Sequence, residues 1–504
     1  MSTNPSSRFR LPRPSAAALA VLCIPAALSA AEPLASATPH VAVEARLLTP
    51  ISTYSARRGM PISAAIITPL CGGGARIVPA GAELRGVVAG VRKVGLGLVH
   101  ESAGLRLHFN QLVLPDGSDY VVATRLFGID NARESVGKKG YIDGIRATAT
   151  ISNRLGERIA FAVLGHPAAM VPLFVLESGV FHFPDPEIEF GRGTVLRLNL
   201  EPPEQLQGLA ACPMPEEPST PAEWLAVQQA VDELPYWTYS KRQSQPMDLV
   251  NLLFEGSQDE LQRAFTAAGW TGSRDNSMGA GVAAIRAIVQ ETSYADAPMR
   301  TLLLDGEEPQ LRLQKSLDTF EKRDHLRIWK RPERLEGREL WASAATRDVG
   351  TTFGMHPFGF THEIQDDVDL ERDTVVHDLV FTGCVDSVAY VQRPEGLRET
   401  GGQYRKGVST DARVALVTLN ACTQPRENFA AVEPGPQPGT LVRVIRRITL
   451  TARNHFIRDN LFYRSADAAR LSYLALRNLD RQAKGERRAR RIEAAAHDGA
   501  ASGN

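Results

Sequence analysis

Residues 323–373 hold the densest set of side chains in the sequence that could carry out chemistry. His325 and Arg327 alternate with apolar residues, and Asp348 and His362 follow within the same stretch. Histidine changes its charge near neutral pH, and arginine binds phosphate or carboxylate through parallel hydrogen bonds. We therefore expect any acid–base, metal or anion chemistry of the chain to lie here.

One interpretation of this stretch is a metal site. His325, His362 and Asp348 would supply ligands, and Asp366 or Asp369 would complete the set, since imidazole and carboxylate suit zinc or manganese. The pair that begins at His362 looks like the start of an H-E-x-x-H motif, but Asp366 stands where the second histidine belongs. The sequence thus names neither a metal nor a cofactor.

A second interpretation is an anion site. Arg323, Arg327 and Arg372 would grip a phosphate or carboxylate, with His325 or His362 as general acid or base. Such a site suits hydrolysis of a phosphorylated or lipid-linked envelope substrate, or binding of an anionic envelope component. A serine hydrolase is disfavoured, because the sequence has no G-x-S-x-G motif.

A structural interpretation competes with both. Asp366, Asp367 and Asp369 stand at the start of a helix expected to run to about Val380, where carboxylates satisfy free backbone amides. Arg372 would pair with these carboxylates. A histidine in a hydrogen-bonded strand needs no substrate.

Strands are the elements expected to position these residues. The odd-numbered residues of 323–329 would project from one face of a strand, and the even-numbered ones would face a core. A turn over Pro332–Gly337 leads to a second strand over Glu339–Thr346. Asp348 then opens a glycine-rich loop.

The N-terminus has the features of a secretory signal peptide. Arg8, Arg10 and Arg13 precede the apolar run Ala16–Leu28, and small residues follow. We expect residues 1–31 to be removed and the mature chain to be periplasmic or associated with the outer membrane. An uncleaved anchor is disfavoured, because a spanning helix needs about 20 residues.

The charge balance excludes one class of partner. The 504-residue chain has 57 Lys and Arg and 57 Asp and Glu. The predicted signal peptide removes three arginines and no acids, which leaves 54 basic against 57 acidic side chains and a formal charge of about −3. We therefore expect no nucleic acid partner.

Four cysteines remain in the mature chain, at Cys71, Cys212, Cys384 and Cys422. An even number in an oxidising compartment favours disulfides, and the absence of C-x-x-C spacing disfavours zinc. We favour the pairs Cys71–Cys212 and Cys384–Cys422, because each then stays within one domain. Free buried thiols are the alternative.

The first domain, residues 40–205, is expected to be an all-β sandwich or barrel, because short β-type runs alternate with turn residues. The runs are 41–48, 62–67, 83–91, 104–114, 120–126 and 194–200. With the Pro-x-Gly step of residues 79–86 before a strand, this part resembles the TrbI-like β-domain of type IV secretion channel proteins. The resemblance implies an envelope β-domain with an envelope protein as partner, rather than a channel.

Residues 142–180 interrupt the β pattern as a predicted helical insertion. In TrbI-like domains a helical insertion in the corresponding place reaches the outer membrane, so the resemblance implies peripheral membrane contact through Ile159–Leu176. Pro167 and Pro172 instead favour a hairpin packed on the β-domain or on a partner, because they cannot sit comfortably in one helix.

A proline-rich linker, residues 206–246, is expected to follow, with a helix at 221–234. Thr220 and Glu223 have capping-box spacing at its start. A stripe that includes Trp224 and Val227 would dock on a neighbouring domain.

The second domain, residues 247–425, is expected to be α+β. A strand over Met247–Phe254 leads to a helix that begins with the capping box of Ser257 and Glu260. A further helix at 281–290 and strands at 301–304, 311–315, 385–391 and 413–419 are expected.

Six short motifs in this domain follow the order seen in the LssY C-terminal domain of bacteria. They are Asp248–Asn251, Ala267–Trp270, Tyr294–Pro298, His325–Trp329, Phe360–His362 and Asp369–Asp373. Residues 246–425 thus resemble that family, whose members commonly occur next to membrane segments. The family often has a second histidine where this chain has Asp324, which weakens a mechanism that needs a histidine pair.

The C-terminal part, residues 440–483, is expected to form a strand over Leu441–Thr451 and a helix over about 466–479, and residues 484–504 a basic flexible tail. Together these features predict an exported bacterial envelope protein that acts as a binding or assembly module. A hydrolase is the alternative, since arginine, histidine and aspartate are dense in the second domain.

Overall fold

The computed structural model describes residues 40–72, 75–95, 101–130, 132–146, 175, 184–212, 220–240, 243–273, 287, 297–315, 322–353, 360–394, 407–426, 435–454, 469, 472–473, 476–477 and 480. Residues 39–504 form one compact unit. The predicted signal peptide, nearly all of the predicted insertion, the predicted helix at 281–290 and the basic tail lie outside the described residues.

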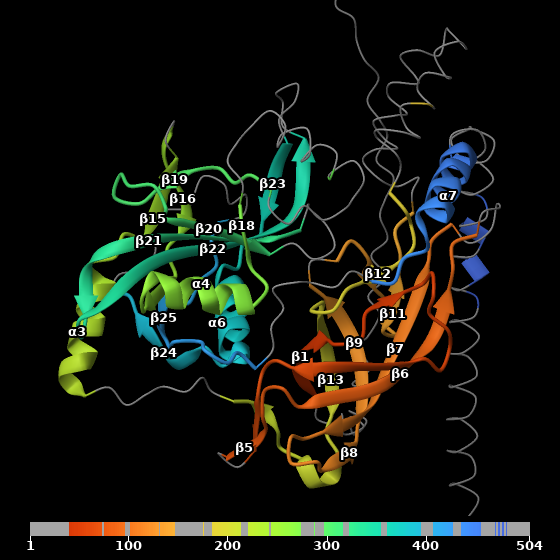
Figure 1. The fold of residues 1–504 in the computed structure, drawn as a ribbon, viewed down its shortest axis with the longest axis horizontal. Helices are drawn as coiled ribbons and strands as arrows, with labels where there is room; N and C mark the ends of the chain where they lie inside the picture. The colour runs from red at the N-terminus through yellow and green to blue at the C-terminus, as the bar shows by residue number, and fades with distance from the viewer. Residues whose placement is uncertain are drawn as a thin grey trace, which may run out of the picture. The chain divides into compact units, whose positions relative to one another are not determined.

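The first part of the chain is β structure, as predicted, and its main sheet is a nearly closed barrel (Figure 1). In the described residues this antiparallel sheet has nine strands in the order β10-β11-β7-β6-β3-β1-β13-β9, with β8 beside β7. They are β1 (Val41–Leu47), β3 (Pro61–Ile66), β6 (Glu83–Arg92), β7 (Gly104–Val113), β8 (Asp119–Val121), β9 (Ala123–Ile129), β10 (Ser135–Val136), β11 (Tyr141–Asp143) and β13 (Val195–Glu201).

Alternating side chains build the core of this barrel. In β7, Leu105, Leu107 and Phe109 are buried and the residues between them are exposed. The run predicted as one strand at 120–126 is two strands, because the chain changes its partner from β7 to β13 at Val122. Ile142, predicted to open the helical insertion, lies in β11 and pairs with β7.

Two small sheets and a disulfide complete this part. The strands are β2 (Ile51–Ser52) with β12 (Glu189–Phe190), and β14 (Ala210–Ala211), β4 (Leu70–Gly72) and β5 (Ala75–Val78); a 3-10 helix η3 spans Glu204–Leu206. Cys71 is bonded to Cys212 across Cα atoms 4.8 Å apart, and Cys384 to Cys422 across 4.6 Å. The favoured disulfide pairing is thereby confirmed.

Helix α3 (Pro221–Asp232) begins with the predicted capping box of Thr220 and Glu223. Val227 is buried against the second part of the chain, but Trp224 is exposed, so the expected docking stripe is narrower than predicted. The linker was predicted to extend to residue 246. Instead, β15 (Trp237–Ser240) and β16 (Gln243–Leu249) form there, and β15 pairs with both β16 and β19 (Leu302–Leu303).

A second large sheet organises the rest, with eight strands among the described residues. Its order is β18-β20-β21-β22-β17-β25-β24, with β23 beside β22, and only the β17–β25 pair is parallel. The strands are β17 (Leu252–Glu255), β18 (Thr271–Gly272), β20 (Leu311–Lys315), β21 (Asp324–Leu335), β22 (Arg338–Phe353), β23 (Phe360–Ile364), β24 (Val385–Gln392) and β25 (Arg413–Leu419). Helices α4 (Gln258–Ala267) and α6 (Asp369–Thr382) lie along one face (Figure 1), so this part is α+β as predicted.

Three predictions for this part were wrong in detail. The expected strand at 247–254 is divided between β16 and β17, because Asn251 turns its side chain to Val368 O and the chain changes sheets. The β21–β22 turn is confined to Glu336 and Gly337, both with positive φ. Asp348 lies within β22 rather than in a loop, because β23 pairs with this strand and extends it.

Residues 440–453 form helix α7 (Thr440–Arg453), so the prediction of a strand at 441–451 was wrong. Val442, Val444, Ile445 and Ile448 suggested a strand because β-branched residues favour one. These residues form a helix rather than a strand because the helix brings Leu450 into the core of the barrel. Among the described residues, no helix is both long and apolar enough to cross a membrane.

Candidate functional site

The predicted polar row lies on one face of β21, as its spacing implied. His325, Arg327 and Trp329 are buried on this face, with Arg323 just before the strand. Leu326 and Ile328 point to the other face and pack with Val375 and Val376 of α6. The row is thus enclosed within the molecule.

His325 and Asp348 are brought together, as predicted. The ring atom Nε2 of His325 lies 2.5 Å from Oδ2 of Asp348. Arg323 donates from Nε to the same carboxylate oxygen at 3.4 Å and from Nη1 to Gln314 Oε1 at 2.9 Å. All four side chains are buried.

Burial lowers the pKa of His325 to about 4; Arg323 and Arg327 act in the same direction, and Asp348 opposes them. The imidazole is therefore neutral at pH 7. With Nε2–H donated to the carboxylate, the lone pair is on Nδ1. Within the described part of the chain, Nδ1 is buried and has no hydrogen-bond partner.

Arg327 is held by two other groups of the chain. Its Nη1 donates to Oδ2 of Asp248 at 2.6 Å, and its Nε donates to the backbone oxygen of Arg300 at 3.2 Å. Asp248 and Gln314 were not predicted as members of this cluster. The available signal was the position of Asp248 among the apolar residues of 247–250, whereas the sequence around Gln314 gave none.

Arg372 lies on α6, which covers the opposite face of the sheet, so the three arginines proposed for an anion site do not converge. Its Nη1 donates to Asp411 Oδ1 at 2.8 Å and to Asp369 Oδ1 at 3.2 Å. The guanidinium also lies 4.9 Å from the ring centroid of Tyr390. The predicted pairing of Arg372 with the carboxylates at the helix start is confirmed for Asp369.

Among the described residues, the structure does not bring the remaining metal-site candidates, which include His362 and Asp366, together into one site. The backbone of His362 lies in β23 opposite Thr351, and its side chain lies outside the described residues. Asp366 precedes α6, where its backbone oxygen accepts from Ser409 N at 2.9 Å. The described residues contain no group of three or more His, Cys, Asp or Glu that could hold a metal ion.

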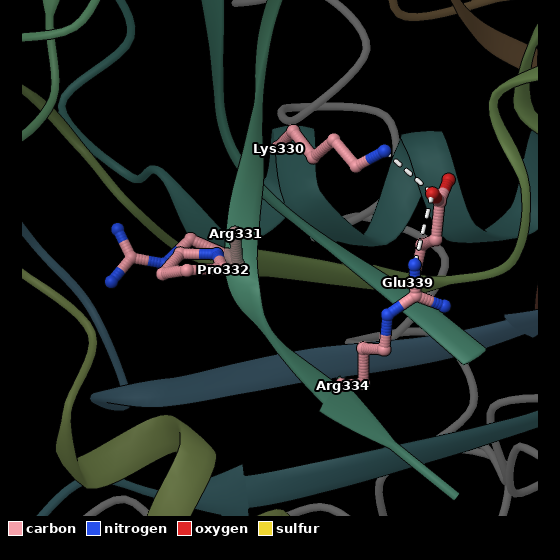
Figure 2. A pocket seen from close by; sticks show the side chains of 5 residues that line it. All are labelled: Lys330, Arg331, Pro332, Arg334 and Glu339. Atoms are coloured by element: carbon pink, nitrogen blue, oxygen red, sulfur yellow. Dashed lines mark hydrogen bonds and ion pairs between the residues drawn. The ribbon is translucent and has the colours of Figure 1, made fainter. Parts of the chain in front are cut away.

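A surface pocket lies at the far end of the β21–β22 hairpin (Figure 2). Glu339 lies between Lys330, whose Nζ is 2.5 Å from Oε1, and Arg334, whose Nη2 is 3.6 Å away. Arg331 points away from them in Figure 2 and pairs with Asp305 at 2.6 Å. These charges are paired with one another, and the candidate site residues lie further along the same strands.

Two further buried ionic clusters lie on the α6 face and were missed by the sequence analysis. In one, Asp378 pairs with Arg46 and with Lys315, whose Nζ is 2.6 Å away, and accepts from Trp270 Nε1 at 3.1 Å. Burial raises the pKa of Asp378, but the two cations outweigh it and hold the pKa below its usual range. The sequence signal for this cluster was a single charged residue, Asp378, within the largely apolar run of residues 375–381.

In the second cluster, carboxylates surround one guanidinium. Nε of Arg347 lies 2.9 Å from both Asp324 and Glu371, and its Nη1 lies 3.6 Å from Asp130. Burial and the neighbouring Asp324 raise the pKa of Glu371 well above its usual range. Arg347 opposes this shift, because its positive charge favours the ionised carboxylate.

Comparison with known families identifies the domain that carries the polar row. Residues 231–409 match the family model of the LssY C-terminus. The matched residues begin within α3 and contain β21, β22, α6 and every candidate charged residue. No curated protein matches the chain in a sequence comparison. The match does not reach residues 40–205, so their TrbI-like character stays a prediction.

Proposed function

We propose that this chain is an exported protein of the bacterial cell envelope that serves as a binding or assembly module. The observation that carries the proposal is the internal pairing of the candidate site. Arg323, Arg327 and Arg372 are each buried and bonded to other groups of the same chain. An arginine whose partners are buried groups of its own chain must break those bonds before it can bind a substrate, and breaking a buried pair costs free energy.

The proposed periplasmic or outer-membrane location has separate support. Both disulfides suit an oxidising compartment, and the N-terminal sequence has the pattern of a signal peptide. Osmotic-shock fractionation should release the chain or leave it with the outer membrane. A thiol count on the denatured, unreduced mature chain should find no free cysteine, and a chain retained in the cytoplasm with reduced cysteines would remove this part of the proposal.

The alternative is a hydrolase of a phosphorylated or lipid-linked envelope substrate. It is favoured by one observation, the neutral His325 that is held through Nε2 by Asp348 while Nδ1 has no partner among the described residues. A neutral imidazole oriented by a carboxylate can act as a general base. The base would take a proton from water only if Nδ1 became accessible, because this atom is buried.

One experiment separates the two proposals. The purified chain and its His325→Gln variant are assayed with p-nitrophenyl phosphate and p-nitrophenyl acetate, with and without added zinc or manganese. The binding proposal expects no turnover above that of the variant, and envelope complexes of the chain that withstand mild detergent and persist in the variant. Turnover that disappears in His325→Gln while the melting temperature is kept would establish the hydrolase instead.

A further inference from the structure

Helix α7 is attached to the barrel by the side that carries Arg446, Leu450 and Arg453. Arg446 donates from Nη2 to Oε1 of Glu187 at 2.7 Å, and its guanidinium lies 5.2 Å from the ring centroid of Tyr54. Leu450 is buried in the barrel core, and Arg453 donates to the backbone oxygen of Gly95. The spacing of four and three residues places these contacts on one side of the helix.

The opposite side of α7 is apolar and exposed. Leu441, Ile445 and Ile448, also spaced by four and three, are 73%, 57% and 45% exposed. Val442 and Val444 are exposed beside them. A surface helix usually turns its apolar face to the core and its charges to water. Helix α7 is oriented the other way, so its apolar face is available to a partner.

This surface is continuous rather than scattered. The five aliphatic side chains follow one another over two turns of a single helix that is fixed to the barrel. Single exposed apolar residues are common on proteins, but a contiguous row marks a site of interaction. The row is separate from the polar row of the LssY-like domain, and the inference does not depend on the function proposed for that domain.

The charge of α7 indicates the class of partner. The helix has four arginines and no acidic residue. Arg446 and Arg453 contact the barrel. Arg443 lies on the same side of the helix as Arg446 and Leu450, and its Nη1 donates to Gln437 Oε1 at 2.7 Å. Arg447 instead adjoins the exposed Val444 at the edge of the apolar face. An apolar face with an arginine at its edge suits an interface between anionic headgroups and acyl chains, where arginine can extend to the phosphates. Pairing with a second α7 would bring like charges together.

We propose that α7 docks the chain on the surface of an anionic lipid bilayer. Leu441, Ile445 and Ile448 enter the boundary between headgroups and acyl chains, and Arg447 contacts a lipid phosphate. The helix lies in the plane of the surface and does not cross it, since Arg446 and Leu450 keep its other side on the barrel.

The test is co-sedimentation of the purified chain with vesicles of phosphatidylcholine alone or mixed with phosphatidylglycerol. We expect binding to the mixed vesicles. The variant Arg447→Gln should weaken it by about fivefold. The triple variant Leu441→Ser/Ile445→Ser/Ile448→Ser should weaken it by more than about tenfold, because three apolar side chains no longer leave water.

Val121→Ser is the matched control, because Val121 is an aliphatic residue 81% exposed in β8 of the barrel. It should bind as the unaltered chain does. The triple variant should keep its melting temperature, since the replaced side chains are exposed. Failure to bind mixed vesicles, or equal binding by the triple variant, overturns the proposal. An oligomer that the triple variant dissociates, without vesicle binding, would instead assign α7 to contact between copies.

Discussion

At the scale of single residues, His325 is the group whose protonation should affect stability most simply. Burial, mainly, holds its pKa at about 4 in the folded chain, whereas an unfolded histidine has a pKa of about 6.5. As the pH falls from about 6.5 to about 4, the unfolded chain binds a proton that the folded chain does not. Above this pH range, His325 does not lower the free energy of unfolding. Below it, the free energy of unfolding is lower by about 3 kcal/mol.

The measurement is the free energy of unfolding in urea between pH 4 and pH 7, for the unaltered chain and for His325→Gln. Glutamine can still donate to Asp348 but does not titrate. The difference between the two proteins isolates His325 from the buried Glu371, whose raised pKa acts in the opposite direction. Parallel pH profiles would show that His325 is not buried in its neutral form.

Residue patterns that obey a local rule were predictable. The period of two in residues 323–329 indicated both faces of β21, and the preference for a pairing that does not join the two predicted domains indicated the disulfides. The bonds from Arg327 to Asp248 and from Arg372 to Asp411 were not predictable, because these carboxylates come from distant parts of the sequence. The three arginines were assigned to one anion site because they are close in the sequence. In the structure, Arg323 and Arg327 lie on one face of the sheet and Arg372 on the other.

At the scale of elements, α4 depends on its predicted capping box. Ser257 Oγ accepts from Glu260 N at 3.2 Å, and Glu260 Oε2 accepts from Ser257 N at 2.7 Å. Ser257→Ala removes the first of these bonds and should lower the free energy of unfolding by about 1 kcal/mol. Ser55→Ala, at an exposed turn, is the control and should change it by less than about 0.5 kcal/mol. Equal stability of the two variants would show that the cap does not stabilise the chain.

Elements were predictable where the sequence pattern and the tertiary contacts agree. Capping boxes predicted α3 and α4, and the alternation of apolar and polar residues predicted β7 and β21. The strand expected at 441–451 was wrong because β-branched residues dominate its local propensity, while contacts of Arg446 and Leu450 with the barrel require a helical spacing. The loop expected after Asp348 was wrong because pairing with β23 adds a partner that local residues do not reveal.

At the scale of the whole molecule, Asp378 joins the two large sheets into one unit. Arg46 lies in β1 of the barrel, and it contacts both Asp378 and the ring of Phe381 on α6, at 5.0 Å from the centroid. Phe381 packs among Ala65, Ile67 and Val195 of the barrel part. The LssY-like domain is therefore held to the barrel by a buried ion pair and an aromatic contact.

Asp378→Asn should lower the free energy of unfolding by about 3–5 kcal/mol, because it removes the carboxylate that the buried Arg46 and Lys315 share. Circular dichroism and tryptophan fluorescence, which includes Trp270 beside the substituted group, would follow unfolding in urea. Glu83→Gln, which breaks the exposed pair with Arg85, should cost less than about 1 kcal/mol. If both variants lost the same small amount, the two sheets would be held together by Phe381 and its neighbours rather than by the charges at Asp378.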